Sequence, residues 1–152
     1  MHIGVISDTH GLLRPEVVAR LQGVDAIIHA GDVGDPEIVT GLGRIAPLHA
    51  IRGNVDRGPG LDNLPTTLVV EFGGVWTYVL HDLNDLDLTP RMADFKLIVS
   101  GHSHKPKLEE RAGVTYLNPG SCGARRFKMP LGMAFVEAVG GVFKAELVEL
   151  EG

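Results

Sequence analysis

Hydrophobic runs alternate with amphipathic segments along the first third of the chain. Three apolar runs rich in β-branched side chains predict buried strands, at residues 3–7, 26–30 and 46–51. Between them, Arg14-Pro15-Glu16 predicts a helix start with proline near its first position, and residues 36–43 predict a second helix. Because strands and helices alternate, this part of the chain predicts a parallel sheet with right-handed crossover connections.

The second half of the chain predicts a series of β-hairpins instead. Apolar segments at residues 67–72 and 75–80 flank Gly73-Gly74, a dipeptide typical of a tight turn. Two further hairpins are predicted. One has strands at residues 107–111 and 114–117 around Ala112-Gly113, and the other has strands at residues 133–139 and 142–150 around Gly140-Gly141.

Other segments complete the pattern. Residues 97–100 predict a strand, and residues 56–65 predict a loop because they contain two glycines and two prolines. Residues 83–95 predict one helical segment, near residues 91–94. We therefore expect a single α/β domain over residues 1–152, whose second half adds antiparallel strands to make two packed sheets.

Composition narrows the class of protein. The 152 residues are 44% hydrophobic and 22% charged, values typical of a soluble globular domain. The formal net charge of −5 argues against a general nucleic-acid surface, although Arg125, Arg126 and Lys128 leave a small anionic substrate open. The single cysteine, Cys122, excludes a disulfide framework and fits a reducing compartment. The sequence shows no signal-peptide pattern and no apolar run of the roughly 18–20 residues that a membrane span needs, so we expect a cytoplasmic protein without a membrane partner.

Polar clusters stand where the apolar runs end. They are Asp8-Thr9-His10, Gly31-Asp32, Gly53-Asn54, His81 and Gly101-His102-Ser103-His104. In an open α/β sheet the carboxyl ends of neighbouring strands meet at one crevice, so these side chains are expected to converge. Together they offer two carboxylates, one amide and four imidazoles, a ligand set suited to two divalent ions such as Mn, Fe, Zn, Ni or Co.

Each cluster has a plainer structural interpretation when it is taken alone. Asp8 is compatible with a turn cap, Gly31-Asp32 is a common turn pair, and His81 is compatible with a core histidine. All the clusters nevertheless fall at strand ends within one small domain, and structure alone does not account for that coincidence. We therefore interpret the set as a metal site.

The ordered set of motifs resembles the calcineurin-like metallophosphoesterases, and among them the small single-domain phosphodiesterases of bacteria and archaea. The resemblance runs along essentially the whole chain. It includes the flanking segments Ile6-Ser7-Asp8-Thr9-His10-Gly11, Ile28-His29-Ala30-Gly31-Asp32 and Asn118-Pro119-Gly120-Ser121. This resemblance implies two packed mixed β-sheets flanked by helices, in a four-layer α-β-β-α sandwich.

The resemblance also implies a division of the ligands between two metal ions. The ligands implied for one ion are Asp8, His10, Asp32 and His104. The ligands implied for the other are Asp32, Asn54, His81 and His102, with Asp32 bridging. A hydroxide between the ions would attack phosphorus, so no side chain is expected to act as the nucleophile. Among the candidate metals we favour manganese.

The chain departs from the family pattern at two positions. Val55 stands where the related protein phosphatases have a histidine that helps to protonate the leaving group. The small phosphodiesterases also lack this histidine, and without it poor leaving groups should react slowly unless water supplies the proton. Asp82 follows His81 where the family usually has glycine.

Five other residues are candidates for contacts with the substrate or for support of the metal ligands, namely Asp56, Arg57, Asn118, Ser121 and Arg125. Asp56 either orients a ligand or is a turn residue, and both interpretations stay open. Asn118 and Ser121 belong to a loop that the family places near its active site, or they form a tight turn. Arg125 either holds a substrate phosphate or lies in a solvated loop.

From these features we expect a metal-dependent enzyme that hydrolyses a small phosphodiester. A phosphomonoesterase or nucleotidase is the alternative among enzymes. A non-catalytic binding scaffold, like the retromer subunit that shares this fold, is the alternative outside them. The net negative charge disfavours a nucleic-acid partner. The apolar strands of the second half are compatible with a homodimer.

Overall fold

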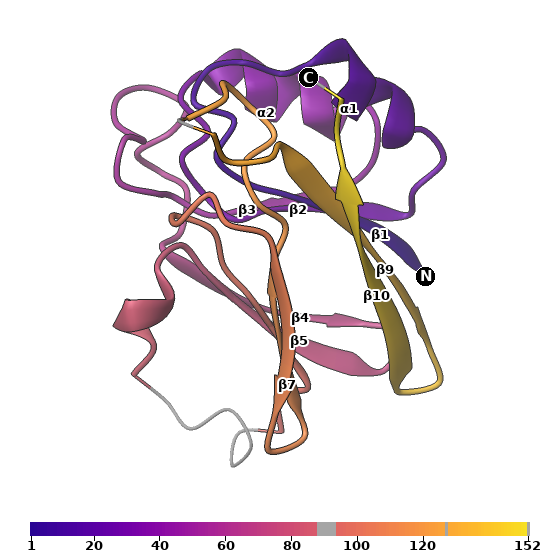
Figure 1. Cartoon of the computed structure of the whole chain (residues 1–152). Helices are drawn as coiled ribbons and strands as arrows, with labels where there is room; N and C mark the ends of the chain where they lie inside the picture. The colour runs from indigo at the N-terminus through magenta and orange to yellow at the C-terminus, as the bar shows by residue number, and fades with distance from the viewer. Residues whose placement is uncertain (88–93, 127, 152) are drawn as a thin grey trace.

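Two five-stranded β-sheets pack face to face in the computed structural model, which describes residues 1–87, 94–126 and 128–151 (Figure 1). The strands of the first sheet are β1 (His2–Ile6), β2 (Ala26–His29), β3 (Leu48–Ala50), β9 (Gly132–Val139) and β10 (Val142–Glu149). The strands of the second sheet are β4 (Thr67–Phe72), β5 (Val75–Leu80), β6 (Leu97–Val99), β7 (Lys107–Arg111) and β8 (Val114–Asn118). Their orders are β10-β9-β1-β2-β3 and β4-β5-β6-β8-β7.

The parallel core expected from the alternating pattern is present in the first sheet. β1 pairs in parallel with β2, and β2 with β3, while β9 pairs with β1 in the antiparallel sense. The crossover connections contain helices α1 (Pro15–Arg20) and α2 (Pro36–Gly43), and both begin with proline. Asp35 caps α2, because its Oδ1 accepts a hydrogen bond from the backbone nitrogen of Glu37 at 2.9 Å. Both helices cover the outer face of this sheet (Figure 1).

The second sheet differs from the expected series of hairpins. The hairpins around Gly73-Gly74 and Ala112-Gly113 form as predicted, and the third predicted hairpin joins β9 to β10 in the first sheet. β5, β6 and β8, however, pair in parallel. A parallel pair needs a connection of about a dozen residues or more, and residues 81–96 provide it between β5 and β6. The expectation that the second half adds antiparallel strands is therefore correct only in part.

A short 3-10 helix, η1 (Leu83–Asp85), follows β5. The side chain of Asp82 caps it by accepting a hydrogen bond from the backbone nitrogen of Asn84 at 3.0 Å. The helical segment predicted near residues 91–94 lies outside the described residues, except for Asp94, which is in a turn. No helix of the described residues is long and apolar enough to cross a membrane.

Hydrophobic side chains pack in one layer between the sheets and in one layer on each outer face. The cluster between the sheets draws on both of them, with Ile28, Val79 and Val99 among its members. Ile27 points to the opposite face of its strand and packs in the cluster under α1 and α2. On the outer face of the second sheet, Ile98 packs with residues in and next to η1. The fold is thus two packed mixed sheets flanked by helices. Helices α1 and α2 cover the first sheet, and η1 is the helix on the outer face of the second sheet within the described residues.

Glycines allow the loops at the carboxyl ends of the strands to interlock. A Cβ atom on Gly101 would overlap Ser7 Oγ and would lie 2.7 Å from Asp8 Oδ2. A Cβ atom on Gly53 would overlap Asp32. Neither glycine has a positive φ, so the reason for glycine here is close packing between loops. The sequence predicted sharp turns or close approach of a substrate instead.

Shortening Ile28 to alanine should test the core between the sheets. Because this side chain is 1% exposed, we expect the free energy of unfolding to fall by about 2–5 kcal/mol. The measurement is urea denaturation followed by circular dichroism. The control is Val69→Ala on β4, which is 53% exposed and should change stability by less than about 0.5 kcal/mol. Equal losses in the two variants would contradict this description of the core.

A methyl group at position 101 should disturb the interlocked loops. We expect Gly101→Ala to lower the free energy of unfolding by about 1–3 kcal/mol, since the new atom forces apart groups that already touch. The matched control is Gly43→Ala in α2, where a Cβ atom meets nothing within 4 Å. It should be neutral or stabilising by up to about 1 kcal/mol. A Gly101→Ala protein as stable as the control would show that the loops have room to move.

Candidate metal centre

All seven predicted metal ligands lie on the loops at the carboxyl ends of β1, β2, β3, β5 and β6. They are Asp8, His10, Asp32, Asn54, His81, His102 and His104. Parallel pairing places these strand ends at one edge of each sheet, and the packing of the sheets brings the two edges together. The loops thus gather side chains that are distant in the sequence.

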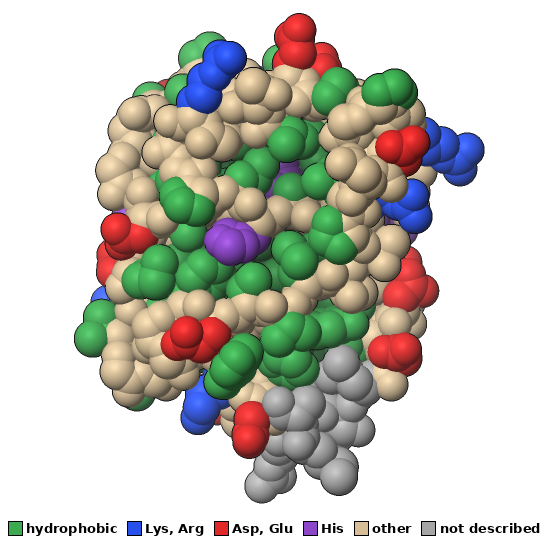
Figure 2. Space-filling view, turned by 180° about the vertical axis from the view of Figure 1, so that it is seen from behind, with side chains coloured by type: hydrophobic (Ala, Val, Ile, Leu, Met, Phe, Trp, Pro, Cys, Tyr) green, Lys and Arg blue, Asp and Glu red, His purple; other side chains and the backbone are tan. Residues whose placement is uncertain are grey.

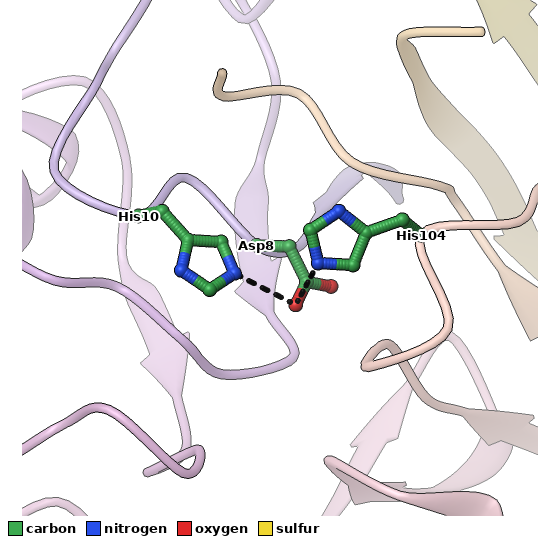
Figure 3. Close-up of side chains that lie close together, drawn as sticks. All are labelled: Asp8, His10 and His104. Carbon is green, nitrogen blue, oxygen red and sulfur yellow. Dashed lines mark ion pairs between the residues drawn. The ribbon is translucent and has the colours of Figure 1, made fainter. Parts of the chain in front are cut away.

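Asp8 lies between the rings of His10 and His104 (Figure 3). Its Oδ1 atom is 3.5 Å from His10 Nε2 and 3.4 Å from His104 Nε2. The ligand atoms of these three residues lie within 4.8 Å of one another, so the group could hold a metal ion. Asp8 and His104 are buried, and His10 is partly exposed.

Asp32, His81 and His102 form a second group whose ligand atoms also lie within 4.8 Å of one another. His81 Nε2 is 3.1 Å from Asp32 Oδ2, and Asn54 Nδ2 is 3.4 Å from His102 Nδ1. The same Oδ2 atom of Asp32 is 3.5 Å from His10 Nε2, which belongs to the first group. Asp32 therefore lies between the two groups, a position that suits a bridging ligand.

Each carboxylate has one oxygen fixed by hydrogen bonds and one that faces the imidazoles. Asp8 Oδ2 accepts hydrogen bonds from Ser7 Oγ at 2.7 Å and from the backbone nitrogen of His102 at 3.1 Å. Asp32 Oδ1 accepts one from the backbone nitrogen of Val55 at 3.1 Å. The other two oxygens are the atoms that approach the histidines. The hydrogen bonds thus aim these oxygens into the centre.

Several polar atoms of the centre are buried without a hydrogen-bond partner in the described part of the chain, among them Asp8 Oδ1, His10 Nε2 and His81 Nε2. Buried polar atoms almost always have a partner in folded proteins. His81 Nδ1 donates to the Ala30 carbonyl at 2.7 Å, so in the neutral ring the lone pair of Nε2 faces Asp32. Two electron-rich atoms that face each other are stabilised by a proton or a metal cation between them. These residues therefore fit a divalent metal ion.

The carboxylates and histidines of the centre shift one another's pKa values. The carboxylate of Asp8 raises the pKa of His10 above its usual value. Burial lowers the pKa of His81, but the Asp32 carboxylate and the Ala30 carbonyl outweigh burial and raise it to about 9. Burial raises the pKa of Asp32, but His81 and a backbone N–H hold it well below its usual range. The centre thus attracts cations, and a metal that binds there must displace protons.

Backbone strain is concentrated at the predicted ligands. Seven non-glycine residues of the described chain have a positive φ, and five of them are Asp8 (57°), His10 (47°), Asp32 (57°), His102 (70°) and His104 (62°). Such conformations are unfavourable for residues with a side chain and persist only where the surrounding structure enforces them. They cluster at functional sites in proteins, so their presence here supports a functional role for these loops.

A buried histidine outside the ligand set holds two of these loops. His29 Nδ1 accepts a hydrogen bond from the backbone nitrogen of Gly31 at 3.1 Å, so Nε2 carries the proton and donates it to Thr9 Oγ1 at 3.0 Å. Thr9 Oγ1 donates in turn to the Val33 carbonyl at 2.8 Å. Burial lowers the pKa of His29 to about 4, so the ring is neutral at pH 7. This series of hydrogen bonds fixes Thr9, which lies between the predicted ligands Asp8 and His10 in the sequence.

Asp56 ties two ligand-bearing loops together. Its buried carboxylate accepts hydrogen bonds from the backbone nitrogens of Gly53 at 2.8 Å, Gly34 at 2.9 Å and Val33 at 3.2 Å. One of these loops carries Asp32, and the other carries Asn54 and Asp56 itself. Of the two interpretations that the sequence left open, the contacts support a role in positioning the ligand loops.

Asn118 and Ser121 also bind loops rather than face a free surface. Asn118 Nδ2 donates to the Gly101 carbonyl at 3.0 Å and to Ser103 Oγ at 3.1 Å. Ser121 Oγ donates to the carbonyl of Asp8 at 3.0 Å. Both side chains are buried, so their contacts support the loops that carry the ligands.

Arg57 and Arg125 are the two basic residues that the sequence offered as candidates for contact with the substrate. Arg57 and Arg125 are exposed, and within the described residues neither makes a hydrogen bond or ion pair with a predicted ligand. The pKa of His104 is lowered by burial and also by the positive charge of Arg126. Arg126 is therefore the basic neighbour whose charge opposes protonation of His104. The sequence could not choose between these neighbours, since the direction of a side chain in a loop depends on its backbone angles.

Similar folds occur among solved structures. An archaeal phosphodiesterase matches with a TM-score of 0.75 at 18% identity, over 97% of this chain and 100% of that one. Vps29 from Entamoeba histolytica, complexed with Zn²⁺, matches with a TM-score of 0.75 at 24% identity, over 98% of this chain and 99% of that one. At these identities the likeness concerns the fold alone.

Sequence comparison gives a more specific result. A probable metallophosphoesterase of Methanothermobacter thermautotrophicus is 34% identical over 142 residues, which cover 86% of this chain and 82% of that protein. The family model of the calcineurin-like phosphoesterase superfamily domain matches residues 1–141. With its two candidate ligand groups at the strand ends, the chain belongs to the calcineurin-like phosphoesterase superfamily.

Proposed function

We propose that this protein hydrolyses a small phosphodiester with the help of two divalent transition-metal ions. The observation that carries the proposal is the pair of ligand groups around Asp8 and Asp32. Buried atoms of Asp8, His10 and His81 in these groups have no hydrogen-bond partner in the described residues. Membership of the phosphoesterase superfamily supports the class of reaction.

The residues divide between two ions in the way that their distances suggest. The first ion would be held by Asp8, His10, Asp32 and His104. The second would be held by Asp32, Asn54, His81 and His102. When bound, the ions would lower the pKa of water and neutralise charge on the phosphoryl oxygens. Imidazole and carboxylate donors without thiolate suit Mn, Fe, Zn, Ni or Co, among which we favour manganese.

The chain's own residues orient these donors before any ion binds. Ser7 Oγ and the backbone nitrogen of His102 hold one oxygen of Asp8, so its other oxygen points to the centre. The Ala30 carbonyl accepts a hydrogen bond from Nδ1 of His81 and holds the ring, so Nε2 is the nitrogen left to bind a metal. Because these contacts are buried, little rearrangement is needed on metal binding.

The position after Asn54 supports a diester rather than a monoester. Val55 has no proton to donate to a leaving group, and its side chain is 48% exposed. Its backbone nitrogen instead holds Asp32. Esters with poor leaving groups should therefore react slowly. The small phosphodiesterases that the chain resembles lack the same histidine, which favours a diester substrate.

A binding scaffold is the competing function. Vps29 from Entamoeba histolytica shares this fold and was complexed with Zn²⁺, so metal binding alone does not separate an enzyme from a scaffold. Every predicted ligand position is filled in this chain, which supports catalysis. Turnover is therefore the measurement that decides between the two functions.

A homodimer stays a prediction. Figure 2 shows many hydrophobic side chains on the face seen from behind, with charged side chains mainly around its border. Of the large hydrophobic residues that are exposed anywhere on the described chain, Val69, Trp76, Val139 and Val142 all lie on strands. Exposed apolar surface is compatible with association between two copies of the chain. The partner that the metal centre itself supports is a small phosphate ester.

Removing the carboxylate between the ligand groups should abolish the activity. We expect Asp32→Ala to lower the turnover of bis-p-nitrophenyl phosphate by on the order of a hundredfold or more, because both ions lose a ligand. Elemental analysis should show less than the two ions per chain of the parent protein. Asp62→Ala, which removes an exposed carboxylate, is the control and should keep both properties. Unchanged turnover in Asp32→Ala, or in protein stripped with chelator, would refute the proposal.

The ratio of diester to monoester hydrolysis should identify the class of substrate. With Mn²⁺ or Ni²⁺ added, we expect bis-p-nitrophenyl phosphate to be hydrolysed faster than p-nitrophenyl phosphate, as a phosphodiesterase requires. Both esters release p-nitrophenolate, so the comparison does not depend on protonation of the leaving group. The comparison uses kcat/KM for the two esters under the same conditions. A strong preference for the monoester would indicate a phosphomonoesterase or nucleotidase, and no metal-dependent turnover of either ester would indicate a scaffold.

A further inference from the structure

A cavity of about 390 Å³ lies directly beside His102. It is bounded by η1, by the loop after β6 and by strand β8, and its lining includes Leu83, Ser103, Lys105, Lys107 and Tyr116. Its size is that of pockets which hold small molecules in proteins. Because His102 is both a predicted metal ligand and part of the lining, a molecule held at the centre can extend into this cavity.

One wall of the cavity is apolar. Tyr116 and Leu83 contribute to it, and both pack in the hydrophobic cluster on the outer face of the second sheet. The guanidinium carbon of Arg111 lies 4.2 Å from the centre of the Tyr116 ring and covers one face of it, so a ligand ring must pack against the rest of the Tyr116 side chain. An aromatic ring offers a flat surface against which another ring can pack.

The rim of the cavity is positively charged. Lys105 and Lys107 line it with one carboxylate, that of Asp82, so its charged residues sum to +1. Lys107 Nζ also contacts Glu109 at 2.8 Å, whereas Lys105 makes no ion pair within the described chain. Lys105 is therefore the stronger candidate for contact with an anion.

The hydroxyl group of Ser103 also lines this cavity. Ser103 Oγ accepts hydrogen bonds from the backbone nitrogen of Lys105 at 3.2 Å and from Asn118 Nδ2 at 3.1 Å. Both contacts use the oxygen as an acceptor, so the hydroxyl proton is left to be donated. A phosphate oxygen is an acceptor of the kind that this proton and the lysines would bind.

A second cavity of about 340 Å³ is lined by two other predicted ligands, and its charged residues sum to −1. Asn54 and His81 line it with one basic residue, Arg52, and with the two carboxylates of Asp82 and Asp85. Asp82 lines both cavities. A phosphodiester held at the centre has two ester arms, and the two cavities would offer these arms different surroundings.

We propose that the cavity beside His102 binds one ester arm of the substrate, and that this arm carries a planar ring and a second negative charge, as a phosphorylated nucleoside does. This inference rests on the proposed phosphodiester hydrolysis. The ring packs against Tyr116, and the charged group is held by Lys105 and Ser103. The other arm is uncharged or cationic, because the second cavity has the added carboxylate of Asp85 and lacks the two lysines.

The first test compares two dinucleotides that differ only in a terminal phosphate. With the metal-loaded protein, kcat/KM for thymidylyl-thymidine carrying a 5′-phosphate should exceed that for the unphosphorylated dinucleotide by about tenfold. In a Lys105→Gln, Lys107→Gln double variant this ratio should fall to about one. The ratio is an internal control for altered folding, and the exposed Lys144→Gln variant should keep the parent value. Equal rates for the two dinucleotides in the parent protein would overturn the proposal.

The second test measures binding without turnover. Thymidine 5′-monophosphate, added to chelator-treated protein, should shift the NMR signals of Tyr116 and Lys105 and leave those of Lys144 unchanged. Tyr116→Leu should weaken this binding several-fold. If no diester is hydrolysed but these shifts appear, the proposed function fails and the binding cavity stands. If diesters are hydrolysed and no shifts appear at Tyr116 or Lys105, the cavity is not the subsite.

Discussion

Two buried carboxylates, those of Asp8 and Asp32, lie 3.5 Å from the same nitrogen atom of His10. Negative charges that are so close, and so far from water, repel each other unless donors and cations compensate them. Ser7 Oγ and the backbone nitrogen of Val55 supply part of this compensation. The imidazoles supply donor atoms through which a metal would provide the rest. The fold serves to hold these charges together, because its parallel strands end at one edge.

The loops that carry the ligands are strained and tightly packed. Five of the predicted ligands have left-handed backbone conformations, and neighbouring loops touch so closely that Gly53 and Gly101 leave no room for a side chain. Groups behind the centre enforce these conformations. Asp56 binds three backbone nitrogens, and neutral His29 bridges Thr9 and Gly31. The resulting rigidity is of the kind that aligns metal ligands before an ion arrives.

Much of the fold could be predicted because it depends on local sequence patterns, which involve residues close together in the chain. β-Branched runs, prolines at helix starts, two Gly-Gly turns and one Ala-Gly turn indicated the first sheet and three hairpins. Polar residues at strand ends indicated the centre. The parallel pairing of β5 with β6 escaped prediction because it depends on how a long connection crosses the sheet. The hydrogen bonds of Asp56 also depend on contacts between residues that are distant in the sequence. The roles of the seven ligands themselves stay predictions.

Each ligand group takes side chains from both sheets. Asp8 and His10 follow β1 while His104 follows β6, and Asp32 follows β2 while His81 follows β5. An ion in either group would therefore bind only the state in which the sheets are docked. By thermodynamic linkage, such binding adds about 1.4 kcal/mol to the stability of that state for each tenfold rise in free ion above its dissociation constant. The supply of metal in the surroundings would then govern the resistance of the sandwich to unfolding as well as its chemistry.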